Sequence, residues 1–146
     1  LDTNVLLLIA AMLALGSAMD KSGAARIFAE LFLRPFQGSS PGLILAAFIL
    51  LTIVATEFMS NAAAAVLLMP VAVSTALTLG VSPKPFIMGI CFGASCSFSL
   101  PFGYQTNLLV YGPGGYRLTD YLKLGIPAGL MAWLISAAMI PRLWPF

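Results

Sequence analysis

Residues 56–61, TEFMSN, form a short polar segment between two long apolar runs, and their types suit the binding of a small ion. Glu57 is the only charged residue between Arg34 and Lys84. The serine and asparagine that end the segment precede four alanines, where they can cap a helix or meet an anion together with its free amides. Because polar groups are costly in lipid, an apolar segment interrupted in this way is a candidate binding site.

A second interruption follows the apolar run 86–100. Pro101 lacks an amide donor and Gly103 permits backbone angles that other residues resist, so a helix should unwind here and resume near Asn107. A resumed helix attracts anions at its start, and unpaired carbonyls hold small cations. The side chains just ahead of this second start are those of Tyr104, Gln105 and Thr106.

The composition of the chain indicates a membrane protein. Hydrophobic residues make up 60% of its 146 residues, 8% are charged, histidine is absent, and the mean hydropathy is +1.01. Soluble domains are typically about 25% charged, so an ordinary globular enzyme is excluded. At about 20 residues per spanning helix, four or five embedded segments fit and no separate soluble domain does. The net charge of +2, without a basic run, gives no argument for nucleic-acid binding.

The apolar runs predict an all-α, polytopic membrane protein. Residues 5–19 and 118–140 predict spanning helices, whereas residues 24–36 mix apolar and charged side chains and suit an interfacial helix. Residues 43–55 cover roughly 20 Å of the ~30 Å hydrocarbon core. They should end at mid-membrane, meet residues 62–79 at the polar segment and form a re-entrant hairpin. A broken helix completes the predicted set.

The sequence leaves two roles open. The Glu57 carboxylate is either tied to backbone amides at the hairpin tip, or it takes part in proton coupling or cation binding. The serine and asparagine at the tip can be a helix cap alone, although two breaks at one depth favour a site. Three serines near the second break suit helix packing better than ligand binding: Ser95, Ser97 and Ser99.

No catalytic residue is predicted, because neither break holds a histidine, paired carboxylates or an activated nucleophile. Cys91 and Cys96 match no metal pattern and are expected to be packing residues. No signal-like segment precedes the first apolar run, so residues 1–146 are expected to be a single membrane domain excised from a longer polytopic protein.

The residues at the two breaks resemble the divalent-anion/sodium symporter family, specifically its C-terminal half. Residues 56–62, TEFMSNA, resemble the T-E-F-x-S-N-T signature of that family. Residues 94–101 and 107–112 resemble its second binding loop and the helix that follows. The similarity extends from residues 2–5 to the end of the chain, and the combination of motifs is specific.

The resemblance implies an elevator-type secondary transporter in the cell membrane. Two inverted repeats would each supply a hairpin tip and a broken helix to a shared site, and this chain would be the C-terminal repeat. Its implied partners are the lipid bilayer, a small anion, the missing N-terminal repeat and a second copy in a homodimer. No cofactor and no metal other than sodium, the coupling ion, is implied.

The resemblance also implies which residues bind. The substrate's carboxylate or sulfate would contact the tip and the second loop at Ser60, Asn61, Ala62, Tyr104, Gln105 and Thr106. Sodium would be held, largely through backbone carbonyls, by Thr56, Met59, Asn61 and Gly103. The chain has Ala62 where the signature has threonine, and residues 103–106, GYQT, where dicarboxylate carriers have A-T-P-P. The bulky tyrosine favours a smaller anion such as sulfate.

The sequence and the resemblance together predict sodium-coupled transport of a small divalent anion, sulfate or a dicarboxylate. One alternative is a proton-coupled carrier or ion exchanger of related fold that uses Glu57. Another is a non-transporting membrane scaffold whose polar breaks pack against a partner subunit.

Overall fold

The computed structural model describes residues 14, 18, 21–22, 31, 34–36, 38–101 and 104–146, except the side chains of residues 105 and 108. A 3-10 helix, η1 (Arg34–Phe36), precedes the hairpin described next. Most of the predicted helices at 5–19 and 24–36 lies outside the described residues. The described part is helical and contains no strand, in agreement with the predicted all-α class.

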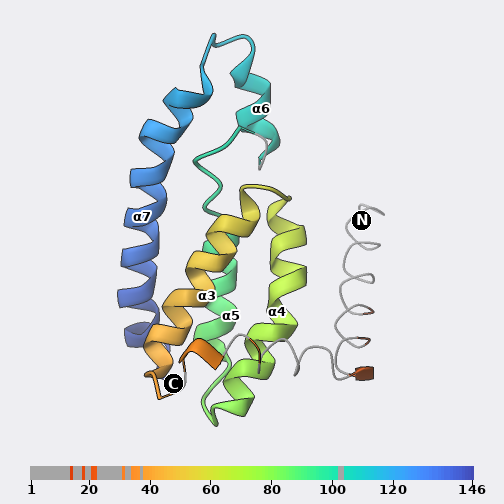
Figure 1. The fold of residues 1–146 in the computed structure, drawn as a ribbon, viewed down its shortest axis with the longest axis vertical. Coiled ribbons are helices and arrows are strands. Elements are labelled where there is room, and N and C mark those ends of the chain that lie inside the picture. The colour runs from red at the N-terminus through yellow and green to blue at the C-terminus, as the bar shows by residue number, and fades with distance from the viewer. Residues whose placement is uncertain are drawn as a thin grey trace.

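Five helices make up the described bundle: α3 (Pro41–Thr56), α4 (Asn61–Thr78), α5 (Lys84–Ala94), α6 (Gln105–Tyr111) and α7 (Leu118–Leu143). Helices α3 and α4 form a hairpin that α5 packs against, and α7 runs along the side of α3 and α5 (Figure 1). Helix α6 lies beyond the turn of the hairpin, beside the first turns of α7. The break between α5 and α6 therefore passes the hairpin turn.

The helix boundaries follow from local residue chemistry. Pro41 occupies the first position of α3 after the N-cap Ser40, where proline gives up no intrahelical bond. Gly80, at φ 69°, ends the α4 segment in the left-handed region that glycine adopts without strain. Pro70 lies inside α4 without ending it.

Two helices are long and apolar enough to cross a membrane, α4 with 18 residues and α7 with 26. Helix α3, with 16 residues, extends over about 24 Å, and α5, with 11, over about 17 Å, both less than the ~30 Å hydrocarbon core. Spanning-length helices beside shorter apolar ones are consistent with a polytopic membrane protein.

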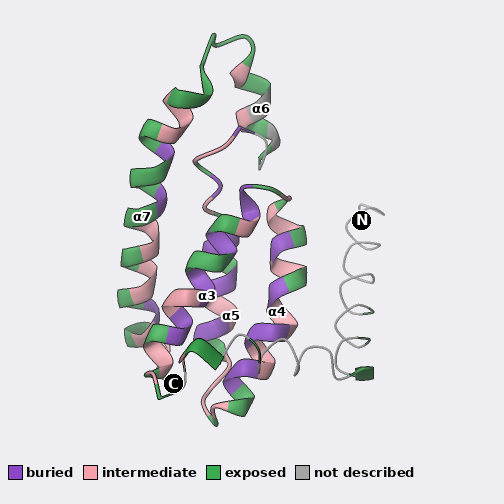
Figure 2. Ribbon diagram, viewed as in Figure 1, coloured by how far each residue is buried: buried purple, intermediate pink, exposed green. Residues whose placement is uncertain are grey.

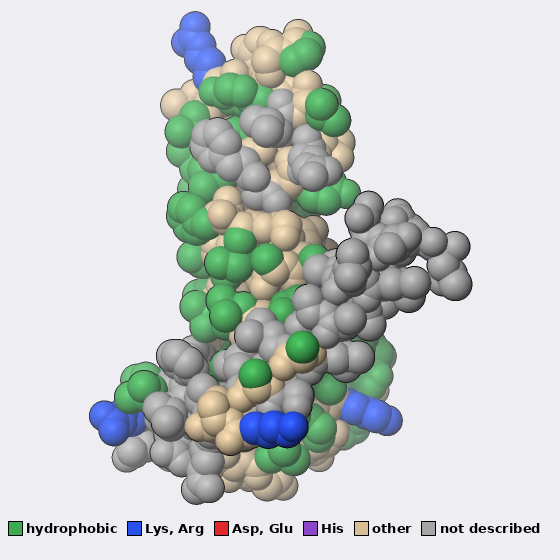
Figure 3. All heavy atoms as spheres, turned by 90° about the vertical axis from the view of Figure 1, so that its right-hand side faces the viewer, with side chains coloured by type: hydrophobic (Ala, Val, Ile, Leu, Met, Phe, Trp, Pro, Cys, Tyr) green, Lys and Arg blue, Asp and Glu red, His purple; other side chains and the backbone are tan. Residues whose placement is uncertain are grey.

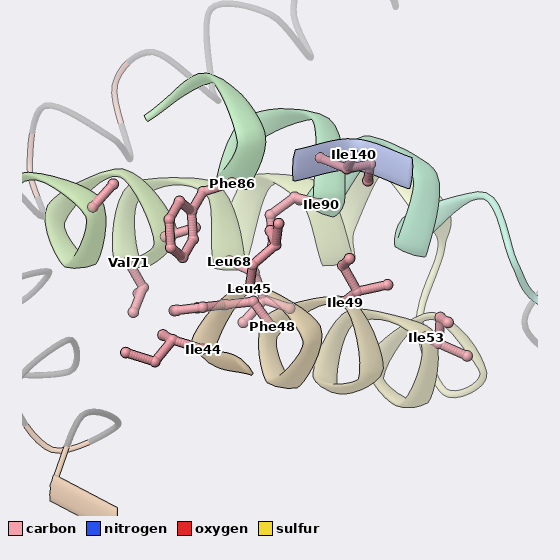
Figure 4. Close-up of a cluster of buried hydrophobic side chains, with 12 residues drawn as sticks. Ile44, Leu45, Phe48, Ile49, Ile53, Leu68, Val71, Phe86, Ile90 and Ile140 are labelled. Carbon is pink, nitrogen blue, oxygen red and sulfur yellow. The ribbon is translucent and has the colours of Figure 1, made fainter. Parts of the chain in front are cut away.

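The core lies between α3, α4 and α5, with a contribution from the end of α7 (Figure 4). Phe48 and Phe86 are fully buried there and meet edge to face, with ring centroids 6.0 Å apart. In lipid, helices associate mainly through close packing rather than through the hydrophobic effect. The labelled side chains around this pair include Ile44, Leu45, Ile49, Leu68 and Ile90.

Glycines bring α5 close to α3. A Cβ added at Gly89 would lie 2.8 Å from Leu45 Cδ1, and one at Gly93 would lie 2.9 Å from Thr52 Cβ. The two glycines are four residues apart and so share one helix face, the small-residue spacing common at helix contacts in membranes. This contact holds the end of α5 beside the end of α3.

The outer surface of the bundle suits lipid. Helix α7 is largely exposed along its length (Figure 2), and its exposed side chains are mostly apolar, including Leu124, Met131, Leu134 and Ile135. On the face seen in Figure 3, Lys and Arg side chains lie at the two ends of the long axis, with hydrophobic and uncharged groups between them among the coloured atoms. Such a band is expected of a chain embedded in a bilayer.

The break after α5 starts earlier than predicted. The helix ends at Ala94 rather than near Leu100, and α6 begins at Gln105 rather than near Asn107. The amides of the last residues before Pro101 bind a side chain from the hairpin turn and so cannot continue the helix of α5. Propensity within the run 86–100 could not reveal this partner because it is distant in sequence.

Candidate functional site

The turn between α3 and α4 presents the start of α4. Ser60 is the N-cap of α4, and its Oγ accepts a hydrogen bond from the Ala63 amide at 3.3 Å. Ser60 is exposed, whereas Asn61 and Ala62 are half-buried. The first amides of a helix lack intrahelical partners and carry partial positive charge. Ser60 therefore caps α4, and the same helix start is suited to meeting an anion.

Thr56 joins this turn to the end of α5. Its Oγ1 lies 2.8 Å from Asn61 Oδ1 and 3.0 Å from the Ala94 carbonyl oxygen, and the residue is fully buried. A hydroxyl has one proton, so it donates to one of these oxygens at a time. With the Asn61 amide turned by 180°, Nδ2 would donate to Thr56 while Thr56 donates to Ala94. In either orientation Thr56 fixes the Asn61 side chain relative to α5.

Glu57 ties the turn to the loop after α5. Its Oε1 accepts hydrogen bonds from the amides of Phe98 at 3.0 Å and Ser99 at 2.8 Å, and its Oε2 accepts one from Leu100 at 2.7 Å. The residue is 6% exposed. Of the two roles left open for this carboxylate, the structure shows the one in which backbone amides bind it. The amides belong to the second break and not to the hairpin tip itself.

Backbone amides at the end of α3 donate to the carbonyls of Val54 and Ala55. The amides of Phe58 and Met59 donate to the Ala55 carbonyl at 3.1 and 3.2 Å, and that of Glu57 donates to Val54 at 3.3 Å. The carbonyls of Thr56 and Met59, two of the predicted sodium ligands, take no part in these bonds. Carbonyls at the end of a discontinuous helix are a common setting for sodium in transporters.

The second half of the predicted site lies at the start of α6. Tyr104 is the N-cap residue of α6 and is 49% exposed, and Thr106 in the first turn is exposed. Gln105 is the first residue of α6, but its side chain lies outside the described part, as does Gly103. Helix α6 was predicted to begin near Asn107, and it begins instead at the residues that the resemblance assigns to substrate binding.

Two residues outside the predicted set hold α6 in place. Asn107 Nδ2 donates to the Ser97 carbonyl at 3.0 Å, and Tyr121 Oη donates to the Asn107 carbonyl at 3.0 Å. Asn107 thus links α6 to the loop through its side chain and to α7 through its backbone. The position of Asn107 directly after the loop break could have indicated its role, whereas nothing in the sequence around Tyr121 indicated a contact with α6.

Gly125 of α7 closes the other side of the loop. A Cβ at this position would overlap with the Phe98 carbonyl and with Ser99 Cα. Glycine is therefore required for α7 to approach the loop backbone this closely. The loop lies between Glu57 on one side and α7 on the other.

The structure brings together one part of the predicted site and leaves another apart. Thr56 and Asn61 are in contact, and the turn that carries Ser60 and Met59 is joined to the second break through Glu57. Within the described part, no hydrogen bond joins Tyr104 or Thr106 to residues 60–62. Among the described residues, the two halves are linked through the loop that Glu57 binds.

A cavity of about 380 Å³ lies between the loop, α6 and α7. Phe98, Asn107, Tyr116, Asp120 and Leu124 contribute to its lining, and none of the predicted site residues whose side chains the structure describes does. Among the described residues, no cluster of His, Cys, Asp or Glu side chains is arranged to hold a metal ion.

Comparison with known proteins identifies the family. The family model described as "Citrate transporter" matches residues 1–146, which is the whole chain. The chain belongs to the citrate transporter family. This result confirms the expectation of a transport protein and is consistent with the resemblance to divalent-anion/sodium symporters.

Individual proteins similar to the chain are longer than it is. An uncharacterized transporter of Synechocystis sp. is 41% identical over 94% of the chain and 22% of the relative. An uncharacterized transporter of Escherichia coli is 36% identical over 97% of the chain and 23% of its own length. Sodium/sulfate cotransporter 1 of Chlamydomonas reinhardtii is 33% identical over 92% of the chain and 15% of the relative. The chain spans less than a quarter of each of these three, and all three are named as transporters rather than enzymes.

Proposed function

We propose that this chain is the C-terminal repeat of a sodium-coupled secondary transporter for a small divalent anion, sulfate or a dicarboxylate. The observation that carries the proposal is the fixing of the α4 start, at Ser60 and Asn61, against a broken helix whose next start is at Tyr104. Two helix starts beside an irregular loop are the arrangement that discontinuous helices use to bind ions within membranes.

In this proposal, the first amides of α4 and the side chains of Ser60 and Asn61 receive the anion. The start of α6, with Tyr104, Gln105 and Thr106, supplies the second wall. Helix starts bind anions without an arginine because amides and the helix dipole both favour negative charge. Ala62 lacks a hydroxyl and Tyr104 is bulky, so sulfate is the favoured substrate. The family relative named as a sodium/sulfate cotransporter supports this choice.

Sodium in this proposal binds beside the anion. Its ligands are Asn61 and the carbonyls of Thr56, Met59 and Gly103, so that Asn61 contributes to both sites. A shared residue would couple the two ligands, since a bound cation orients the same side chain that meets the anion. The coupling free energy would be lost with that side chain.

The remaining walls of the site are proposed to come from an N-terminal repeat, consistent with the greater length of the relatives. The hairpin of α3 and α4 is then re-entrant, and the turn is surrounded by protein rather than lipid. The transporter is a homodimer in the cell membrane, and an elevator movement carries the site across it.

Uptake into proteoliposomes containing the complete transporter tests this function. We expect sodium-dependent uptake of labelled sulfate, competed by divalent anions, and a loss of uptake in Asn61→Ala. Thr78→Ala, which removes a hydroxyl at the opposite end of α4, should transport normally. Uptake that survives both Asn61→Ala and the removal of sodium would contradict the proposal.

The same assay separates the alternatives. A proton-coupled carrier would show uptake that is independent of sodium and depends steeply on pH, and Glu57→Gln would abolish that dependence. Both carboxylate oxygens of Glu57 already accept backbone amides, so sodium coupling is the better supported choice. A scaffold would show no uptake of any anion.

A further inference from the structure

Three consecutive amides in the loop after α5 point at one carboxylate. Those of Phe98, Ser99 and Leu100 lie 3.0, 2.8 and 2.7 Å from the oxygens of Glu57. Successive amides that converge on one point form a concave anion site of the kind found in phosphate-binding loops. The chain fills this site with its own side chain. We call residues 98–100 the amide nest.

The amide nest lies between the two halves of the proposed transport site. Glu57 precedes the cap residue Ser60 by three positions, and Leu100 precedes Tyr104 by four. Hydrogen bonds between Glu57 and the nest therefore fix the spacing of the two helix starts. Thr56 makes a parallel connection to the Ala94 carbonyl, but that contact holds α5 and not the loop beyond it.

Helix α6 depends on this connection. Among the described helices, α6 has no extensive packing against α3, α4 or α5, and its identified bonds go to Ser97 and Tyr121. Ser97 adjoins the amide nest, so a loop that shifts would move Asn107 and the start of α6. Gly125 supports the loop from the side of α7 by steric contact alone.

We propose that Glu57 is a positioning residue, whose carboxylate occupies the amide nest as a fixed anion and sets the distance between the two anion-binding helix starts. In this role Glu57 transfers no proton and touches no substrate. The inference rests on the proposed transport function for its kinetic consequence. The anion-binding character of the nest stands independently of transport.

Removing the side chain should leave a site for a free carboxylate. Glu57→Ala deletes the Cγ methylene and the carboxylate, which together correspond to acetate. Acetate should therefore bind the vacated nest, and acetamide, a neutral molecule of the same shape, should not replace it because its amide group would face an N–H donor. Binding to the folded form alone raises thermal stability by mass action.

Two measurements on the complete transporter test the proposal. In the first, the melting temperature of purified Glu57→Ala is expected to rise with acetate and to be unaffected by acetamide, with no acetate response in the parent. In the second, sulfate uptake by Glu57→Ala in proteoliposomes is expected to fall at least tenfold and to recover several-fold with acetate. Glu57→Gln, which keeps an acceptor for two of the three amides, should raise the KM for sulfate while largely retaining the maximal rate.

Asp120→Ala is the matched control for the loss of a carboxylate. Asp120 also accepts a backbone amide, from Arg117 at 2.8 Å, but it is a single bond at the start of α7. Its variant should show no acetate-dependent change in melting temperature or uptake. If Glu57→Ala ignores acetate in both measurements, or if Glu57→Gln keeps the parental KM, the proposal is wrong.

The thermal measurement distinguishes this inference from the transport proposal, since it requires no transported substrate. If acetate raises the melting temperature of Glu57→Ala but the transporter takes up no anion, the amide nest is supported and the proposed transport function is wrong. Sodium-dependent sulfate uptake without an acetate response, or with an unchanged KM in Glu57→Gln, would retain the transport function and overturn the positioning role. If Glu57→Ala does not fold without acetate, the amount of folded protein recovered in acetate and in acetamide is measured in place of the melting temperature. More folded protein is expected in acetate alone.

Discussion

The hydroxyl of Thr56 lies 2.8 Å from Asn61 Oδ1 and 3.0 Å from the carbonyl of Ala94, so one buried side chain touches the start of α4 and the end of α5. Asn61 is five residues from Thr56 in the sequence, whereas Ala94 is 38 residues away. The contact therefore determines where the proposed ion-binding asparagine lies relative to the broken helix.

Replacing Thr56 with valine keeps the shape of the side chain and removes this contact. We expect Thr56→Val to destabilise the transporter by about 1–2 kcal/mol, because a buried carbonyl loses its partner, and to raise the sodium concentration needed for half-maximal uptake. Thr52→Val is the control, since its hydroxyl donates only to Phe48 within α3 at 2.7 Å. Equal effects of the two variants on sodium dependence would contradict the role of Thr56.

Ser60 and Ser82 offer a second matched pair. Each hydroxyl accepts a hydrogen bond from a backbone amide, at 3.3 Å from Ala63 and at 3.4 Å from Lys84, but Ser60 precedes α4 and Ser82 lies in the loop between α4 and α5. Loss of the Ser60 cap should cost about 1 kcal/mol in thermal unfolding, and Ser60→Ala should in addition reduce the affinity for sulfate. Ser82→Ala should leave the uptake kinetics unchanged. A parental sulfate KM in Ser60→Ala would argue against contact between Ser60 and the anion.

The loop between Glu57 and α7 should not tolerate a larger residue at Gly125. An added methyl group would overlap with the backbone of Phe98 and Ser99, so Gly125→Ala is expected to lower stability by about 1–3 kcal/mol and to impair uptake. At Gly129 a Cβ would meet Ile53 Cγ2 at 3.9 Å, an ordinary contact. Gly129→Ala should therefore be neutral or slightly stabilising. Thermal unfolding of the two purified variants, measured side by side, checks this difference.

Helix α6 should shift when its bond to α7 is lost. Tyr121→Phe removes the hydroxyl that donates to the Asn107 carbonyl at 3.0 Å while keeping the ring near Tyr111 and Tyr116. The expected cost is about 1 kcal/mol in stability, with a weaker affinity for sulfate because Tyr104 and Thr106 are less firmly placed. Tyr116→Phe, which keeps the same ring cluster, is the control. Identical sulfate affinity in both variants would show that Tyr121 does not position the site.

The sequence was sufficient to predict where the helices start and stop around the first break. Pro41, the polar segment and the alanines that follow determine local structure, so the hairpin of α3 and α4 lies close to its predicted bounds. Local rules failed at Leu100, because its amide bonds to a carboxylate 43 residues earlier in the chain. Periodicity and propensity contain no information on such a partner.

The candidate site divides in the same way. Ser60, Asn61 and Thr56 could be selected because a polar cluster within an apolar run is conspicuous, and the cap and the contact between them are found. Gly125 could not be selected, since its importance arises from the approach of α7 to the loop backbone. Tyr121 could not be selected either, because it is one of several tyrosines near the α6–α7 turn.

The pairing of three successive amides with one carboxylate also restricts the length of the loop. An inserted or deleted residue within positions 97–100 would move each amide by one place and turn it away from Glu57. The α6–α7 turn at 112–117 bears no such constraint, since all of its residues are exposed. Homologous transporters should accordingly vary in length at the α6–α7 turn, while the spacing between Ala94 and Pro101 stays fixed.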